Sequence, residues 1–418
     1  MAKVNLFTAA RIAMEEEDIG TSSSVNNDVA QNEVENIEAQ NEVEEVAKLT
    51  SEIEQVASQI EEGIDEGEKL DEAIVEGEEV LENNEGGDVP EEAVEVAQEA
   101  LSESILLLAG REGKKQFKPS LESYETNIQK LRVSLEAAKD FANNVWQKIK
   151  ELFAKFVVMI KKFALKLGAM FDKGAKQAEA LKKIFEQRKV FDSEKVTDEF
   201  KDRLAKTYPA FIKYPGIKYV STIGDNVSAM IESRIKSIPG VVKDFLNGQP
   251  KPDTLSNQQM KNFGVESNLK EDDVDGKEIL QFVVPRRYGV WYIGTQGSTG
   301  FEKVDVSGDD INSSELNLSA DNLAKSAGNL KIMANKYKTI VNTASNELNK
   351  ASDEINKLRD ADLKGALDYE EKAKARKNAN IAYKIATQVT FQTLGQAQDV
   401  ISGSLALLSI LSSAYKKA

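Results

Sequence analysis

The side chains that could do chemistry in this chain are carboxylates, lysines and hydroxyls, because the sequence holds no cysteine and no histidine. It therefore offers no disulfide, no thiolate nucleophile, no imidazole metal ligand and no histidine base for a serine or cysteine mechanism. Ser233 and Lys236 fit a Ser-x-x-Lys pattern, but so short a match often arises by chance and its companion motifs are missing. We interpret this pair as a chance match.

Two loop sequences come close to ligand-binding motifs and then depart from them. Residues 272–276 begin like a calcium loop, but with Gly276 in sixth place the twelfth place falls on Phe282, where a glutamate is needed. Residues 295–301 are glycine-rich but lack the lysine of a phosphate-binding loop. The paired carboxylates near the N-terminus lie in a segment expected to be solvated, which cannot hold an acid/base pair. The sequence thus predicts no catalytic residue, no metal ligand and no cofactor, and we expect a protein that is not an enzyme.

Charge is distributed very unevenly along the 418 residues, whose formal net charge is −16. Residues 1–110 carry 31 acidic and four basic side chains, for a net charge of −27. Residues 111–220 carry 25 Lys and Arg against 14 Asp and Glu, and the rest of the chain balances. Blocks of opposite charge indicate a polyanionic partner for the basic block, or pairing of one block with the other.

Within the basic block, residues 141–173 separate lysines from apolar residues on a helical wheel. At 100° per residue, five lysines fall within roughly 40° of one another. We call them the lysine stripe: Lys148, Lys155, Lys162, Lys166 and Lys173. A broad neighbouring arc is apolar, and we call the following residues the apolar face: Phe153, Phe156, Ile160, Phe163 and Leu167. Val158 and Leu165 spill onto the remaining surface.

Three interpretations of this basic amphipathic helix remain open. It is the core helix of a bundle with a solvated lysine stripe, or it inserts at a membrane interface. At such an interface the stripe contacts anionic headgroups and the apolar face contacts acyl chains, and both contacts are favourable. In the third interpretation it docks against a polyanion, either nucleic acid or the acidic part of its own chain. Lysines without arginine forks or stacking aromatic rings imply neutralisation of charge and no reading of bases.

The fold expected around this helix is mainly α and has four parts. Residues 1–110 form an acidic, partly disordered arm and a possible propeptide, because from residue 20 onward they lack Phe, Tyr and Trp and cannot bury enough apolar surface. Their Val, Ile and Ala recur at three- and four-residue steps, which predicts fraying helices. Residues 111–190 form the basic amphipathic region, residues 191–310 a small α+β domain, and residues 311–418 a long antiparallel helical hairpin.

The β signal is confined to residues 279–306, where β-branched and aromatic runs alternate with turn residues. We expect a small antiparallel meander there. The N-terminus has no continuous apolar core and reaches four acids in a row at Glu15–Asp18, which is not typical of a secretory signal. No run approaches 18 uncharged apolar residues, so the sequence predicts no transmembrane span and assembly in a cytoplasm.

The acidic, helix-prone N-terminal part is followed by SLESYETNIQKLRVSLEAAKDFANNVWQKIKELFAKFVVMIKKFALKLGAMF, residues 120–171. Together they resemble the internal head proteins of large contractile-tailed bacteriophages, over mainly residues 1–175. The resemblance implies a virion protein of the capsid interior, packaged into the prohead in the host cytoplasm beside capsid or scaffold proteins. It also implies cutting by a capsid maturation protease, a separate viral protein that removes a propeptide.

In the T-even-like group that protease prefers a Leu or Ile two residues before a Glu and cuts after the Glu. Four sites in the acidic part match this preference: Ile60–Glu62, Ile64–Glu66, Leu70–Glu72 and Leu101–Glu103. The site at Leu101 and Glu103 stands out because it lies at the boundary between the two charge blocks. A cut after Glu103 would turn a net-acidic precursor into a net-basic product.

The leading hypothesis is therefore an internal head protein that is processed and associated with packaged DNA, and whose acidic arm suppresses premature binding to DNA or membrane. The first alternative is a membrane-active protein whose amphipathic helix perturbs the host envelope after ejection. The second alternative is a prohead assembly scaffold.

Overall fold

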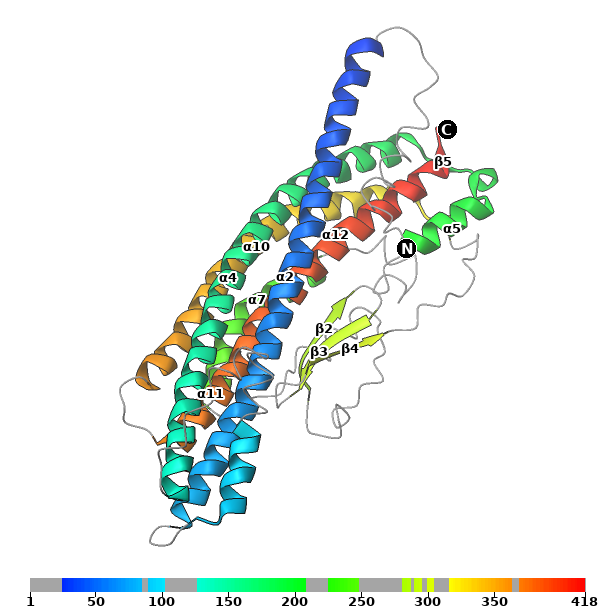
Figure 1. Ribbon diagram of the computed structural model, residues 1–418. Helices are drawn as coiled ribbons and strands as arrows, with labels where there is room; N and C mark the ends of the chain where they lie inside the picture. The colour runs from blue at the N-terminus through cyan, green and yellow to red at the C-terminus, as the bar shows by residue number, and fades with distance from the viewer. Residues whose placement is uncertain are drawn as a thin grey trace.

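Long helices that run roughly side by side make up most of the computed structural model (Figure 1). The structure describes the backbone of residues 25–84, 89–101, 126–207, 225–247, 280–286, 289–294, 299–303, 316–362 and 368–417. Side chains are described for residues 45–84, 89–101, 126–204, 229, 231–247, 316–355 and 368–417. The helices are α2 (Val25–Glu82), residues 91–101, α4 (Asn127–Gln187), η2 (Ser193–Lys195), α5 (Asp198–Thr207), α7 (Asp225–Leu246), α10 (Ala320–Asp362), α11 (Tyr369–Lys384), the π-helical turn η4 (Ile385–Val389) and α12 (Thr390–Ser413). The predicted mainly α fold is confirmed.

The central helix is α4, and its sequence explains both its start and its burial. Thr126 caps it, since the Thr126 hydroxyl accepts a hydrogen bond from the backbone N–H of Gln129. Apolar side chains then recur every three or four residues and are buried from Leu131 to Phe185. α10, α2 and α12 all pack against this helix, with α10 making the most extensive contact.

α2 packs antiparallel against α4, and its buried positions follow a seven-residue repeat. The buried residues of the repeat are Val46, Ile53, Ala57, Ile60, Ile64, Asp71 and Ile74. Two glycines let the large side chains of α4 approach closely. A Cβ atom on Gly67 would lie 3.0 Å from the Trp146 ring, and one on Gly77 would lie 2.7 Å from a Leu135 methyl group.

The expectation of a solvated acidic arm is therefore corrected for residues 45–84 and 89–101. Residues 45–82 and 91–101 are helical, as the apolar spacing predicts, but Ile53, Ile60 and Ile64 are fully buried. The segment has no aromatic side chain of its own, and α4 supplies them instead. A chain of low hydrophobicity can fold once a partner surface covers its apolar stripe, because burial offsets the ordering entropy. Residues 1–24, 85–88 and 102–110 lie outside the described part of the arm.

α10 and the continuous helix α11–η4–α12 run in opposite directions, as the predicted hairpin requires, but they do not pack on each other alone. α4 and α7 also contact both of them. Among the described residues, Tyr369–Ser413 is the one helical segment long and apolar enough to cross a membrane, and 89% of its most apolar 18-residue window is buried. Within the bundle it is a core helix.

Two small antiparallel sheets accompany the helices in the described part of the chain. β2 (Leu280–Arg286), β3 (Gly289–Gly294) and β4 (Thr299–Lys303) form a meander in the order β2-β3-β4, which confirms the predicted one. The second sheet was not predicted and pairs β1 (Val190–Phe191) with β5 (Tyr415–Lys416). It ties the end of α4 to the end of α12 (Figure 1).

Candidate functional site: two charged regions of the bundle

The lysine stripe lies on the part of α4 that faces solvent between α2 and α10. Four of its five lysines are exposed, and the fifth, Lys173, is half-buried. On one side, Lys166 pairs with Glu45 of α2. On the other side, Asp172 pairs with Lys338 of α10, with 2.5 Å between the Oδ2 and Nζ atoms. These two ion pairs mark the edges of the exposed face.

Three lysines of the stripe, Lys148, Lys155 and Lys162, have no carboxylate partner among the side chains that the structure describes. Beside them, Val158 is 50% exposed and Leu165 is 70% exposed. At the rise of an α-helix the stripe spans about 37 Å. Double-stranded DNA carries one phosphate charge per roughly 1.7 Å of its axis, so a row of this length can face several phosphates.

The apolar face is buried in the bundle, with no residue more than 3% exposed. Phe153 lies edge-on to Tyr383 of α11, with ring centroids 4.5 Å apart, and Phe163 lies 5.9 Å from Phe391 of α12. The arrangement is that of a core helix with a solvated lysine stripe. A membrane could meet the apolar face only if α4 left α11 and α12.

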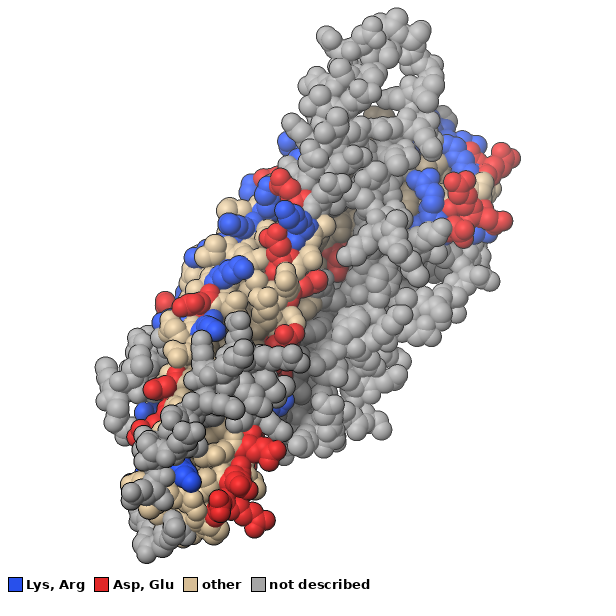
Figure 2. Space-filling model, in the orientation of Figure 1, with Lys and Arg blue, Asp and Glu red and all other residues tan. Residues whose placement is uncertain are grey.

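Figure 2 shows acidic side chains concentrated at the lower end of the described surface, whereas acidic and basic side chains are intermixed in its upper part. The acidic side chains of the lower end lie over the end of α2 and residues 91–101, and basic side chains spread along α4 higher up. The exposed acids of that end are Glu72, Glu76, Glu79, Glu82, Glu91, Glu92, Glu95 and Glu99. The described part of the acidic arm therefore flanks the lysine stripe and leaves it uncovered.

The predicted processing site lies partly outside the described residues. Leu101 is fully buried, and Glu103 falls in the undescribed segment 102–125. The apolar residues of the other three matching sites, Ile60, Ile64 and Leu70, are fully buried in the middle of α2.

The second charged region is centred on a buried carboxylate and joins three helices. Asp71 of α2 is 3% exposed, and its carboxylate accepts hydrogen bonds from Trp146 of α4 (3.1 Å) and Tyr369 of α11 (2.6 Å). It also accepts one from the Arg376 guanidinium of α11 at 2.9 Å, and Arg376 donates a second bond, of 2.6 Å, to the amide oxygen of Asn143. We call these five residues the Asp71 cluster.

Two opposing effects act on the pKa of Asp71 in the Asp71 cluster: burial and pairing with Arg376. Burial raises the pKa of the Asp71 carboxyl, while the charge of Arg376 and the hydrogen bonds from Tyr369, Arg376 and Trp146 act in the opposite direction. Burial and the charge of Asp71 also raise the pKa of the Tyr369 hydroxyl, which keeps its proton and donates it. Lys139 lies 5.3 Å from the Tyr369 ring centroid and pairs with Glu78.

A row of polar contacts continues the Asp71 cluster along α2, α11 and η4. Its pairs, with donor-to-acceptor distances, are Lys377–Glu72 (3.8 Å), Asn380–Glu68 (3.0 Å), Lys384–Asp65 (2.7 Å) and Gln388–Glu61 (3.2 Å). Partners step by three or four residues along each helix in opposite directions, as antiparallel packing requires. Exposed pairs of this kind contribute little each, so the buried Asp71–Arg376 pair dominates the row.

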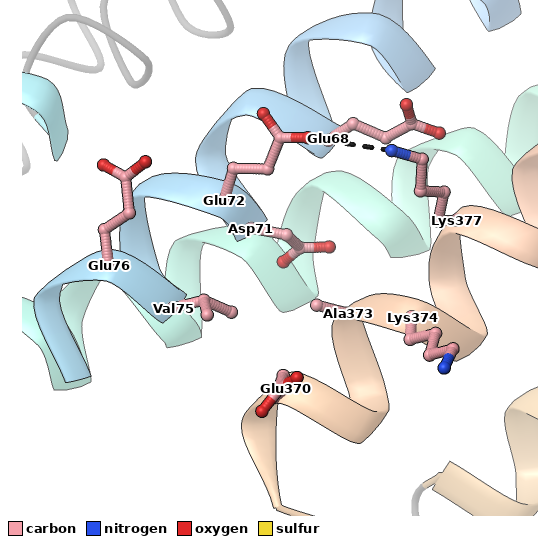
Figure 3. A pocket seen from close by; sticks show the side chains of 9 residues that line it. All are labelled: Glu68, Asp71, Glu72, Val75, Glu76, Glu370, Ala373, Lys374 and Lys377. Carbon is pink, nitrogen blue, oxygen red and sulfur yellow. Dashed lines mark ion pairs between the residues drawn. The ribbon is translucent and has the colours of Figure 1, made fainter. Parts of the chain in front are cut away.

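Beside the Asp71 cluster, an open cleft of about 330 Å³ lies between α2 and α11 (Figure 3). Five carboxylates and two lysines line it with two apolar side chains: Glu68, Asp71, Glu72, Val75, Glu76, Glu370, Ala373, Lys374 and Lys377. Figure 3 shows Asp71 between the two helices and Lys377 reaching across to α2. Over the described ranges, no group of three or more acidic side chains is placed to hold a metal ion.

Sequence reasoning missed the Asp71 cluster, although α2 carries a signal for it. Asp71 falls at the position of the seven-residue repeat that Ala57 and Ile64 occupy, and Glu78 follows seven residues later. A charge at an apolar position of such a repeat needs a specific partner. For Asp71 that partner is Arg376, which is 305 residues away along the chain.

A family model described as phiKZ-like phage internal head proteins matches residues 30–409, a range that contains the lysine stripe and the Asp71 cluster. No curated protein and no solved structure matches the chain.

Proposed function

Since the chain belongs to the phiKZ-like phage internal head proteins, we propose that it is a structural protein of the phage head whose lysine stripe contacts packaged DNA. The resemblance to internal head proteins is confirmed by the family match, which also implies a place inside the head. A protein inside a filled head is surrounded by a polyanion at close range. DNA is therefore the first partner to consider for an unpaired row of cations.

The observation that carries the proposal is the exposure of Lys148, Lys155 and Lys162 on one face of α4 without described carboxylate partners. Lysines neutralise phosphates as point charges, release counterions and read no bases. The contact we propose is therefore independent of DNA sequence and strongly dependent on salt.

The test is the salt dependence of duplex DNA binding by the full chain. Each lost phosphate contact lowers the slope of log affinity against log salt by about 0.9. The double variant Lys155→Ala and Lys162→Ala should therefore lower the slope by about two and weaken binding equally for unrelated sequences. Fluorescence anisotropy of a labelled duplex, from low to physiological salt, measures both.

The matched control removes two exposed lysines elsewhere, Lys243→Ala on α7 and Lys417→Ala near the C-terminus. It changes the net charge by the same amount and should leave the slope unchanged. Equal slopes for the two double variants, or no binding by the native chain at low salt, would contradict the proposed DNA contact.

We also propose that the maturation protease hydrolyses the peptide bond after Glu103. Leu101 and Glu103 fit the preference for Leu two residues before Glu, and the bond after Glu103 lies beyond α2, the helix in which the Leu or Ile of the other three matching sites is buried. Lys69 and Arg111 bound the tryptic peptide that spans this bond. Mass spectrometry of DNA-filled particles should find a semi-tryptic peptide that begins at Ser104.

Recovery of only the intact peptide 70–111 from filled particles would refute the cut. Complete absence of the protein from filled particles would instead favour the assembly scaffold. Binding to anionic lipid vesicles by the full chain, without salt-dependent DNA binding, would favour the membrane-active alternative. The proposal includes contacts with capsid or scaffold proteins during assembly and no catalytic role.

A further inference from the structure

The described part of the acidic arm is attached to the rest of the protein by much more than its peptide link. Residues 45–101 form one side of two hydrophobic cores. In the larger core, Ile53, Ile60 and Ile64 pack with residues of α4. In the smaller core, Val94 and Leu101 pack with residues of α4 and α11.

Polar contacts add specificity to this attachment. The side-chain amide of Asn127 donates to the carbonyl of Val89 at 3.1 Å, and the Gln98 amide donates to the Ser134 hydroxyl at 3.3 Å. The Asp71 cluster lies farther along the same interface, where a buried carboxylate meets its only described cation, Arg376, across the boundary.

We propose that the surface formed by α4 and α11 is a binding site for residues 45–101 as a separate chain. After the chain is cut between Leu101 and Thr126, this segment stays bound, so that the product contains two chains in equal amounts. The two-chain product forms in the phage only if the proposed processing takes place there, so this part of the inference rests on the proposed function. The binding itself is a property of the interface.

Retention has a consequence for charge. Residues 1–110 carry most of the negative charge of the protein. If the cut segment stays bound, Glu45 remains beside Lys166 of the lysine stripe. The two-chain product then keeps the negative charge of the segment and does not become net positive. Access of DNA to the stripe then depends on the exposure of Lys148, Lys155 and Lys162, which the bound segment already allows.

The experiment replaces residues 113–119, which lie in the undescribed segment, with the recognition sequence of a site-specific protease in the full chain. After complete cutting, verified on a denaturing gel, the protein is passed over a size-exclusion column in physiological salt. Both fragments should elute together in equal amounts at the volume of the uncut protein. Elution of the fragments at separate volumes would overturn the inference.

The contribution of the buried carboxylate is measured on the same cut protein. Removing one partner of a buried ion pair is strongly destabilising, so Asp71→Ala should raise the dissociation rate of the smaller fragment at least about 100-fold. The milder Asp71→Asn should raise it less, because the amide oxygen can still accept the hydrogen bond from Tyr369, although the bond from Trp146 to the second carboxylate oxygen is lost. Glu79→Ala, an exposed acid on the same helix, should leave the rate unchanged.

Exchange of a fluorescently labelled smaller fragment against excess unlabelled fragment gives these rates. Equal rates for Asp71→Ala and Glu79→Ala would remove the Asp71 cluster from the binding site, and the column result stands apart from that outcome. If Asp71→Ala does not fold uncut, Asp71→Asn carries the comparison.

Failure of this inference and failure of the proposed processing give different results. Separation of the fragments on the column, together with a Ser104 terminus in particles, refutes retention and leaves processing intact. Co-elution on the column, together with only intact peptide 70–111 in particles, supports the binding site and refutes processing.

Discussion

Lys155 and Arg376 are both cations on helices of one bundle, yet their surroundings differ completely. The Arg376 side chain is 12% exposed, and its guanidinium is bonded to Asp71 and Asn143. Lys155 is exposed, and no described carboxylate pairs with it. Charges of the first kind hold helices together, and charges of the second kind remain available to a partner.

The difference separates two properties that net charge alone would merge. Changes in the Asp71 cluster should alter stability and leave DNA binding with its native salt slope. Changes in the lysine stripe should alter the salt slope and leave stability unchanged. A variant in one region that alters the other region's property would contradict this separation.

Arg376→Ala should have the largest effect on stability, because it leaves the Asp71 carboxylate buried without its cation. We expect a loss of about 3–5 kcal/mol in the free energy of unfolding. Urea denaturation followed by circular dichroism measures it. Lys377→Ala is the control, since this neighbour is exposed and its pair with Glu72, at 3.8 Å, should contribute less than about 1 kcal/mol. Equal costs for the two variants would mean that burial of the pair does not matter.

Ile60→Ala should have the next largest effect, since it tests whether the acidic arm belongs to the core. Ile60 is fully buried, so its truncation should leave a cavity and cost about 3 kcal/mol. The exposed neighbour Gln59→Ala should cost less than about 0.5 kcal/mol. A near-zero cost for Ile60→Ala in the same urea titration would contradict the burial of this segment and support a solvated arm.

The pH dependence of Asp71→Asn should be a smaller effect with a definite sign. The folded-state pKa of Asp71 is raised by burial, so the folded protein keeps a proton at pH values where the unfolded chain has lost it. The free energy of unfolding therefore falls as pH rises from the ordinary aspartate pKa through the raised one. Asp71→Asn removes this slope, so the cost of the substitution should shrink as pH rises.

Urea denaturation of both proteins at several pH values above the sequence pI of about 4.9 measures this change. Burial also raises the pKa of Glu68, but that residue is present in both proteins and cancels in the difference. A cost that grows with pH would show that the charge of Arg376 and the three hydrogen bonds to Asp71 outweigh burial.

Local patterns in the sequence predict much of this architecture. Residue spacing predicts the helical character of α2, α4 and α10, and β-branched runs with turn residues predict the meander. These features depend on neighbours within a few residues. The wheel of residues 141–173 likewise separates the exposed lysines from the residues that become buried.

What the sequence does not predict depends on partners far away along the chain. The poor composition of α2 indicates disorder when considered alone, and only the side chains of α4 make its burial favourable. Asp71 needs Arg376, and β1 needs β5, across separations that no periodicity reports. Composition indicates how much apolar surface a segment can bury by itself. Whether α2 is buried depends on the apolar side chains that the neighbouring helices pack against it.

The smallest expected effect is on the stability of the lysine-stripe variant. Lys155→Ala with Lys162→Ala removes two exposed side chains without described partners, so the free energy of unfolding should change by less than about 0.5 kcal/mol. The same variant should lower the salt slope of DNA binding by about two, while Arg376→Ala leaves that slope unchanged at temperatures where it is folded. Urea denaturation gives the stability of both variants, and fluorescence anisotropy gives the salt slope of DNA binding for both. If Lys155→Ala with Lys162→Ala costs more than 1 kcal/mol, the stripe is part of the scaffold and its exposure is not evidence of a partner.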